Sequence, residues 1–251
     1  MDAETTKVDE LSLPQAFLLL ATNDKNGKPE VPVYALRTTL AGAILAELEL
    51  LGAIELQGKN VRATGATPKT ELQHELELIR GKSRPHTPKR WVSMRENRAE
   101  VQRIYEGMAS QGIVEHVGEK RLGLFKSTRY PEKDHGPEAA LLQKIKTALS
   151  GAPSEAVKPD ATAPEAKAPD AMTDSNAPDT KAPAAKPDSK VPDARTTALI
   201  ALLQAAGLLG KLFPATDQSR AAQLAKDYWP SRAVEDELRM IRLAEAEAPT
   251  L

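Results

Sequence analysis

Basic side chains gather in one stretch of this 251-residue chain, between positions 80 and 103. The stretch carries eight basic and two acidic residues, whereas the whole chain has a net charge of −1. Such a cluster can attract phosphate groups, because Arg and Lys donate charge-assisted hydrogen bonds to phosphate oxygens. A solvated helix surface is the alternative explanation. The side chains predicted to face an anionic ligand are Arg90, Arg95, Arg98 and Arg103.

The spacing within this stretch indicates which arginines act together. Arg95 and Arg98 are three residues apart, so we expect them to share one face of a single helix. Arg98 and Arg103 lie in the apolar–polar pattern that leads to Gly112, where the same helix is expected to end.

Catalytic and metal-binding patterns are missing from the sequence. There is no Cys, and no phosphate-binding glycine loop or nucleophile elbow occurs. The histidines do not have the spacing of metal ligands. We therefore predict that the protein is not an enzyme, binds no metal and needs no cofactor. The four histidines are His74, His86, His116 and His135.

A helix–glycine–hairpin unit occurs twice and must position these side chains. "GAIELQG" begins at Gly52 and "GIVEHVG" begins at Gly112, each after an amphipathic helix. This order resembles a winged helix, which makes a nucleic-acid-binding regulator one alternative. Neither preceding helix, however, presents the exposed basic, Asn/Gln-rich face that reads bases. Each hairpin could equally lie at the edge of a helical core.

The second hairpin carries an apolar tip. Leu122, Leu124 and Phe125 could be buried in the protein's own core or against another surface. Burial of each side chain would contribute about 1.5–3 kcal/mol in either environment. The sequence leaves both possibilities open.

Composition divides the chain into four segments. Residues 1–10 are predicted to be a disordered N-terminus, and residues 11–150 the first part of a helical domain. Residues 151–194 contain eight of the 19 prolines and few large apolar residues, as in a disordered linker. Residues 195–251 expose too much apolar surface to fold alone, so we expect them to complete the same domain.

Capping signals predict where several helices begin and end. Pro14, Thr67, Thr87 and Ser231 mark expected starts, and Gly52 marks an expected stop. A single buried helix is expected across 195–213; its apolar part is too short and too polar to span a membrane. The predicted fold class is mainly α, a single globular helical domain with short edge β-hairpins.

The order of these segments resembles the Golgi phosphoprotein 3 family. The resemblance is carried by "LPQAFLLLATNDKNG", "LAGAILAELELLGAIEL", "TPKTELQHELELI", "GIVEHVGEKRLGLFKSTRYP" and "RTTALIALLQAAGLLGKLF". It implies a helical peripheral membrane protein that binds phosphatidylinositol 4-phosphate and acts as an adaptor. It also implies that the second hairpin, with Leu122, Leu124 and Phe125, contacts a membrane or a second copy of the chain. The Ala-rich style is similar to that of bacterial members.

The family's lipid pocket implies four positions in this chain. A Trp position falls near Pro32, an Arg position on Ala41, and two Arg positions on Arg98 and Val101. Only Arg98 keeps the family residue, and Arg103 is a nearby substitute. We therefore expect binding to follow negative charge more than the 4-phosphate.

These observations together predict a peripheral, anionic-lipid-binding adaptor. Its expected partners are anionic phospholipid head groups, or phosphatidylinositol 4-phosphate if family behaviour holds. It is expected in the cytoplasm on a membrane surface (the Golgi in a eukaryote), with possible homo-oligomers through the hairpin and no nucleic acid. The alternatives are a winged-helix-like regulator and a protein-contact scaffold.

Overall fold

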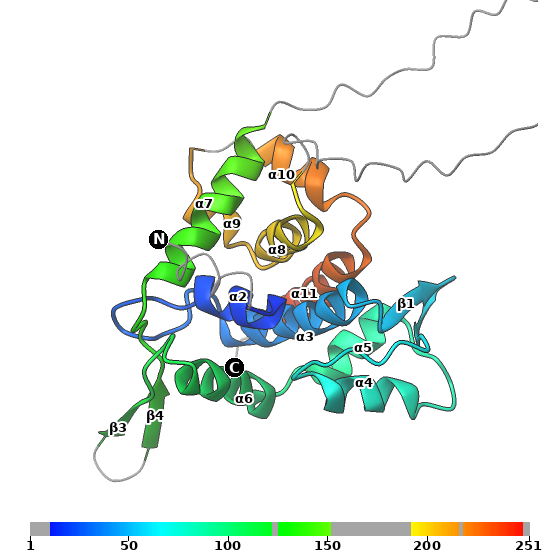
Figure 1. Ribbon diagram of the computed structural model, residues 1–251, viewed down its shortest axis with the longest axis horizontal. Coiled ribbons are helices and arrows are strands. Elements are labelled where there is room, and N and C mark those ends of the chain that lie inside the picture. The colour runs from blue at the N-terminus through cyan, green and yellow to red at the C-terminus, as the bar shows by residue number, and fades with distance from the viewer. Residues whose placement is uncertain (1–10, 122–124, 152–191, 216–217, 248–251) are drawn as a thin grey trace, which may run out of the picture.

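Helix α3 (Val33–Leu50) lies at the centre of the computed structural model (Figure 1), which describes residues 11–121, 125–151, 192–215 and 218–247. Thirteen of its 18 residues are buried, because helices pack on it from several sides. The other helices are α2 (Leu13–Leu20), α4 (Gln73–Arg80), α5 (Pro88–Arg95), α6 (Arg98–Ser110), α7 (Gly136–Ser150), α8 (Ala194–Ala205), α9 (Leu209–Leu212), α10 (Gln218–Ala225) and α11 (Trp229–Glu247).

Two antiparallel hairpins lie at the edges of this helical body. Strands β1 (Ile54–Gln57) and β2 (Asn60–Ala63) turn at Gly58, whose φ of +61° suits glycine. Strands β3 (Val117–Arg121) and β4 (Phe125–Arg129) project away from the helices beside α6 (Figure 1). The mainly α class with small edge hairpins is confirmed.

Close packing of α3 and α11 explains a glycine in the middle of α3. A Cβ added at Gly42 would lie 2.2 Å from Cγ2 of Val234, so the absence of a side chain lets α11 approach. Helix α8 also packs against α2 and α3, and its apolar residues belong to the same core cluster. The segment that follows residue 191 therefore shares one core with the segment that precedes residue 151.

Several predicted helix boundaries are confirmed. Pro14 lies in the first turn of α2, and Thr87 is the N-cap of α5, its Oγ1 accepting a hydrogen bond from the Arg90 N–H. Gly52, with φ +65°, follows the end of α3. These positions are set by local chemistry, which is why the sequence reveals them.

Other boundary predictions are wrong. Helix α4 begins at Gln73 and not at Thr67, since the Gln73 side chain instead donates to the Pro68 carbonyl of an irregular segment. Helix α11 begins at Trp229, two residues before Ser231, whose hydroxyl donates to the Tyr228 carbonyl.

The helix expected across 195–213 is divided. Helix α8 begins at Ala194, the last residue of the predicted linker, with Asp193 as its N-cap. It ends at Ala205, because Gly207 adopts φ +73° and interrupts the helical path before α9. Apart from this helix start, Gly151 and residues 192–193, the predicted linker lies outside the described residues, as do residues 1–10. Among the helices of the described ranges, none is both long and apolar enough to cross a membrane.

Candidate functional site

A cavity of about 320 Å³ opens between α3, α6, β4 and the loop that follows α2. Arg37 of α3 and Arg98, the first residue of α6, both line it, together with the aromatic rings of Tyr105 and Tyr130. The remaining lining residues are Gly27, Pro29, Val33, Leu36, Val101, Gln102 and Thr128. The cavity thus combines two cations with an apolar and aromatic wall.

The two guanidinium groups are available to a ligand. Arg98 is exposed and Arg37 is half-buried. Within the described ranges neither group lies within ion-pair distance of a carboxylate, although Arg37 acts on Glu96 through a longer-range Coulomb interaction. Two such arginines in one cavity favour an anion that carries several oxygen acceptors.

Two stacked tyrosines form the back of the cavity. The rings of Tyr105 and Tyr130 lie 4.4 Å apart at an interplanar angle of 4°. The Tyr105 hydroxyl contacts Thr22 Oγ1 at 2.5 Å, and burial raises its pKa to about 12. The buried Tyr130 hydroxyl has no hydrogen-bond partner among the described residues. Its pKa is raised by burial, an effect that the charge of Arg98 opposes.

Gly27 allows the loop that follows α2 to pack closely against the segment after β4, at the edge of the cavity. Gly27 has φ +62°, and its backbone carbonyl accepts a hydrogen bond of 3.3 Å from the Tyr130 N–H. A Cβ at this position would lie 2.4 Å from the Pro131 nitrogen. A tight turn at Gly27 therefore positions one rim of the cavity.

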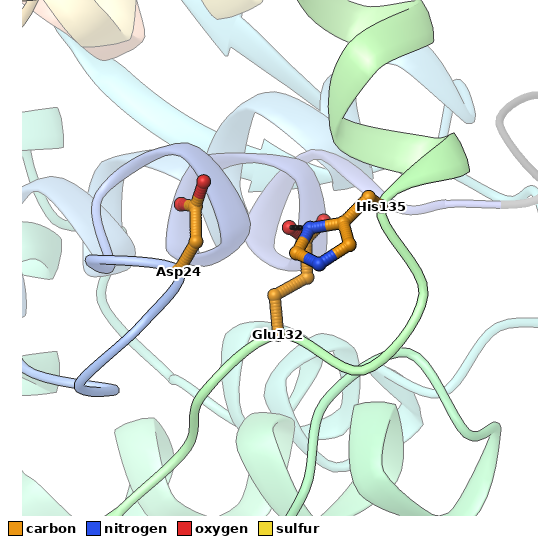
Figure 2. Close-up of side chains that lie close together, drawn as sticks. All are labelled: Asp24, Glu132 and His135. Atoms are coloured by element: carbon orange, nitrogen blue, oxygen red, sulfur yellow. Dashed lines mark hydrogen bonds and ion pairs between the residues drawn. The ribbon is translucent and has the colours of Figure 1, made fainter.

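A group that could hold a metal ion includes one residue of the same loop and two residues of the segment between β4 and α7. Asp24, Glu132 and His135 each offer one ligand atom, and these atoms all lie within 4.8 Å of one another (Figure 2). The sequence search found no ligand spacing because Asp24 is remote in the chain from the other two. The Glu132–His135 spacing of three residues was the only local signal.

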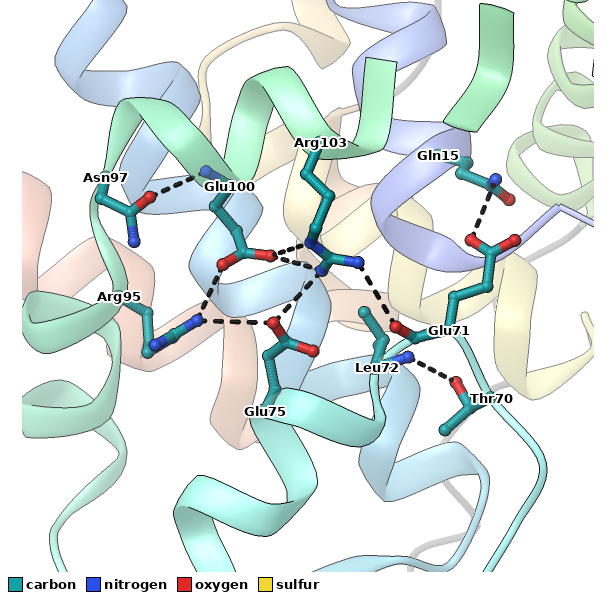
Figure 3. Close-up of polar contacts among 9 residues, drawn as sticks. All are labelled: Gln15, Thr70, Glu71, Leu72, Glu75, Arg95, Asn97, Glu100 and Arg103. Atoms are coloured by element: carbon teal, nitrogen blue, oxygen red, sulfur yellow. Dashed lines mark hydrogen bonds and ion pairs between the residues drawn. The ribbon is translucent and has the colours of Figure 1, made fainter. Parts of the chain in front are cut away.

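Two of the predicted lipid-binding arginines are committed to an internal network (Figure 3). Arg95 contacts Glu100 at 2.7 Å and Glu75 at 3.4 Å, and its side chain is 16% exposed. Arg103 contacts the same two carboxylates and also donates to the Glu71 carbonyl at 3.3 Å. Both guanidinium groups therefore compensate buried acids and tie α4 to α5 and α6.

The pKa values of the two acids in this network, Glu75 and Glu100, are shifted in opposite directions. Burial acts to raise the pKa of Glu100, but the hydrogen bonds and charge of Arg103 outweigh it, so this pKa is lowered. The pKa of Glu75 is raised, chiefly by burial and also by the charge of Glu100. The two neighbouring carboxylates share the positive charge of Arg95 and Arg103, and this arrangement favours the ionised form of Glu100 over that of Glu75.

Of the remaining predicted site residues, Arg90 lies apart from the cavity. Arg90 is exposed on α5 and does not line it. Arg95 and Arg98 do not share one helix, because Asn97 is extended and begins α6 as its N-cap. Leu122 and Leu124 lie outside the described residues, and Phe125 begins β4.

Sequence reasoning missed Arg37. It lies four residues before Ala41, so the two positions share one face of α3. Ala41 is the position at which the resemblance implies an arginine. A search of the neighbouring helical turns would have revealed this substitute.

Comparison with known proteins supports the resemblance but provides no named relative. The family described as Golgi phosphoprotein 3 (GPP34) matches residues 13–241. No curated protein matches the chain. Because the family match spans nearly every element that builds the core and the cavity, the chain belongs to the Golgi phosphoprotein 3 (GPP34) family.

Proposed function

We propose that this protein is a non-enzymatic peripheral membrane adaptor that binds the head group of an anionic phospholipid between Arg37 and Arg98. The carrying observation is that both arginines line one cavity without an ion-pair partner in the described ranges. Family membership adds support for a membrane role. The protein would dock reversibly on the cytoplasmic face of a membrane.

The cavity's chemistry suits a phosphorylated head group. Arg37 and Arg98 can donate hydrogen bonds to phosphate oxygens. The basic residues around the cavity would add a general attraction of about 1 kcal/mol each near an anionic bilayer. Phosphatidylinositol 4-phosphate is one candidate ligand, and other anionic lipids share the required charge.

The test compares arginines inside and outside the cavity. Arg98→Ala and Arg37→Ala should each weaken co-sedimentation with anionic liposomes by about 10- to 100-fold, because each removes hydrogen bonds to a charged group. Arg90→Ala is the matched control, since Arg90 is exposed and does not line the cavity. The control should lose about fivefold at most, the value of one screened surface charge.

Liposome composition then distinguishes the ligands. Affinity is measured for phosphatidylglycerol, phosphatidylinositol and phosphatidylinositol 4-phosphate at matched surface charge, and duplex DNA is tested at the same salt. Equal losses for all three arginine variants would contradict a head-group cavity. Tighter binding to DNA would favour the winged-helix alternative, and no binding to either would favour a protein-contact scaffold.

A further inference from the structure

Three side chains from two segments of the chain converge beside the cavity. Asp24 lies in the loop after α2, Glu132 follows β4, and His135 precedes the first residue of α7. Figure 2 shows the Glu132 carboxylate against the His135 imidazole, with Asp24 on the neighbouring loop. One ligand atom from each of the three lies within 4.8 Å of the others.

Burial of Glu132 distinguishes this group from an ordinary acidic surface. Its side chain is only 3% exposed, and Oε2 contacts Nδ1 of His135. Oε1 is also buried, and the Glu138 carboxyl lies against the same carboxylate. A buried carboxylate without a compensating charge is costly, so its position beside two further ligand groups points to a bound cation.

A third carboxyl borders this group. Glu138, in the first turn of α7, is 8% exposed. His135 contributes the imidazole ring of this group, and its side chain is 71% exposed. A divalent cation would compensate the acids where solvent cannot.

The backbone holds the ligand-bearing segments together before any ion binds. The Glu132 N–H donates to the Asp24 carbonyl at 3.0 Å, and the Tyr130 N–H donates to Gly27 at 3.3 Å. The Gly136 N–H donates to Asp134 Oδ1, which fixes the chain just after His135. Side-chain rotations alone would therefore bring the three ligand atoms to metal-binding distance.

The donor types select a class of ion. Mg²⁺ and Ca²⁺ prefer sites made of oxygen alone, whereas an imidazole nitrogen with carboxylates suits divalent first-row transition ions. Zinc–oxygen and zinc–nitrogen bonds of about 2.0–2.2 Å place tetrahedral ligands about 3.4 Å apart. Atoms already within 4.8 Å can reach that spacing by small movements.

We propose that Asp24, Glu132 and His135 bind a divalent first-row transition-metal ion, with Glu138 next to the ligand set. The ion would fasten the loop after α2 to the start of α7. Because the same loop carries Gly27 on the cavity rim, the site would stabilise the geometry of the cavity. Its role is structural, and no reaction is assigned to it.

The test uses the full chain with any affinity tag removed. Isothermal titration with ZnCl₂ or MnCl₂ should give one saturable site, and the melting temperature should rise by about 5 °C or more at a hundredfold excess over Kd. Glu132→Gln and His135→Gln should each weaken binding at least tenfold. Visible absorption of bound Co²⁺ would report nitrogen and oxygen ligation and should disappear in both variants.

His74→Gln is the matched control, because His74 is exposed on α4 and has Glu77 three residues away. It should bind within twofold of the unchanged protein. Melting in EDTA shows whether each variant is folded, and the ligand variants should melt no lower than the unchanged protein. The proposal is overturned if neither ion binds, if folded ligand variants bind as tightly as the control, or if Ca²⁺ or Mg²⁺ binds preferentially.

Discussion

A buried ion pair joins the two halves of the chain, and its removal should be strongly destabilising. Glu47 of α3 is 5% exposed, and its carboxylate accepts hydrogen bonds from Arg195 Nη1 at 2.7 Å and Nη2 at 2.9 Å. The same carboxylate accepts from the Leu13 N–H at 2.7 Å. Arg195 belongs to α8, so the pair fastens α8 to α3 and to the start of α2. We therefore consider the substitution Arg195→Met.

The magnitude follows from what remains buried. Without Arg195, the Glu47 carboxylate keeps the Leu13 N–H but loses its compensating charge. Breaking a buried pair from one side costs about 3–5 kcal/mol. Because the Arg195 side chain is 36% exposed, water can reach part of the site, and we expect about 3 kcal/mol. At about 2–4 °C per kcal/mol in a domain of this size, the melting temperature should fall by about 6–12 °C.

Urea unfolding followed by circular dichroism and tryptophan fluorescence measures this loss. Arg239→Met is the control, because Arg239 and Asp236 form an exposed pair worth less than about 1 kcal/mol. Adding Glu47→Gln to Arg195→Met should recover part of the stability, since no buried charge is then left unpaired. A loss below about 1 kcal/mol, or two separate unfolding transitions, would refute the view that residues 195–251 complete the domain through this contact.

Three further outcomes are expected. Gly42→Ala should cost about 1–3 kcal/mol through overpacking on α11, and Val234→Ala should relieve it in the double variant, as measured by urea midpoints. Gly27→Ala should lower the melting temperature and weaken liposome binding together, because φ is +62° and the backbone lies 2.4 Å from the added Cβ. The lowered pKa of Glu100 contributes stability above pH ~4.5 that is lost as pH falls through the folded pKa, so Glu100→Gln should flatten the acid limb of a stability–pH profile.

Features fixed by local chemistry could be predicted from the sequence. Thr87 followed by a proline caps α5, and Gly52 and Gly58 adopt the positive φ expected of a helix stop and a hairpin turn. The mainly α class followed from the helical periodicity of the apolar residues. In each case the physical cause lies within a few residues, so one sequence contains all the information needed.

Features fixed by tertiary contacts could not be predicted. The charge count between positions 80 and 103 treated Arg95 and Arg103 as available, but α4 brings Glu75 against both of them. Glu75 lies only five residues before this stretch, but the sequence does not show that it contacts Arg95 and Arg103. The break at Gly207 was missed for a different reason, because an isolated glycine within an apolar helical pattern is often tolerated.

The proposed head-group cavity suggests how a binding chemistry could persist while the positions of its residues change. An arginine at position 41 and one at position 37 would project from the same face of α3, four residues and about 6 Å apart along the axis. Arg37 therefore supplies the same type of charge opposite Arg98, but its side chain starts from a backbone position four residues earlier in α3. A displacement of that size is comparable with the width of a phosphate group. The cavity should thus retain attraction for an anionic head group while its preference for one phosphate position is altered, which is why the three lipids are compared at matched charge.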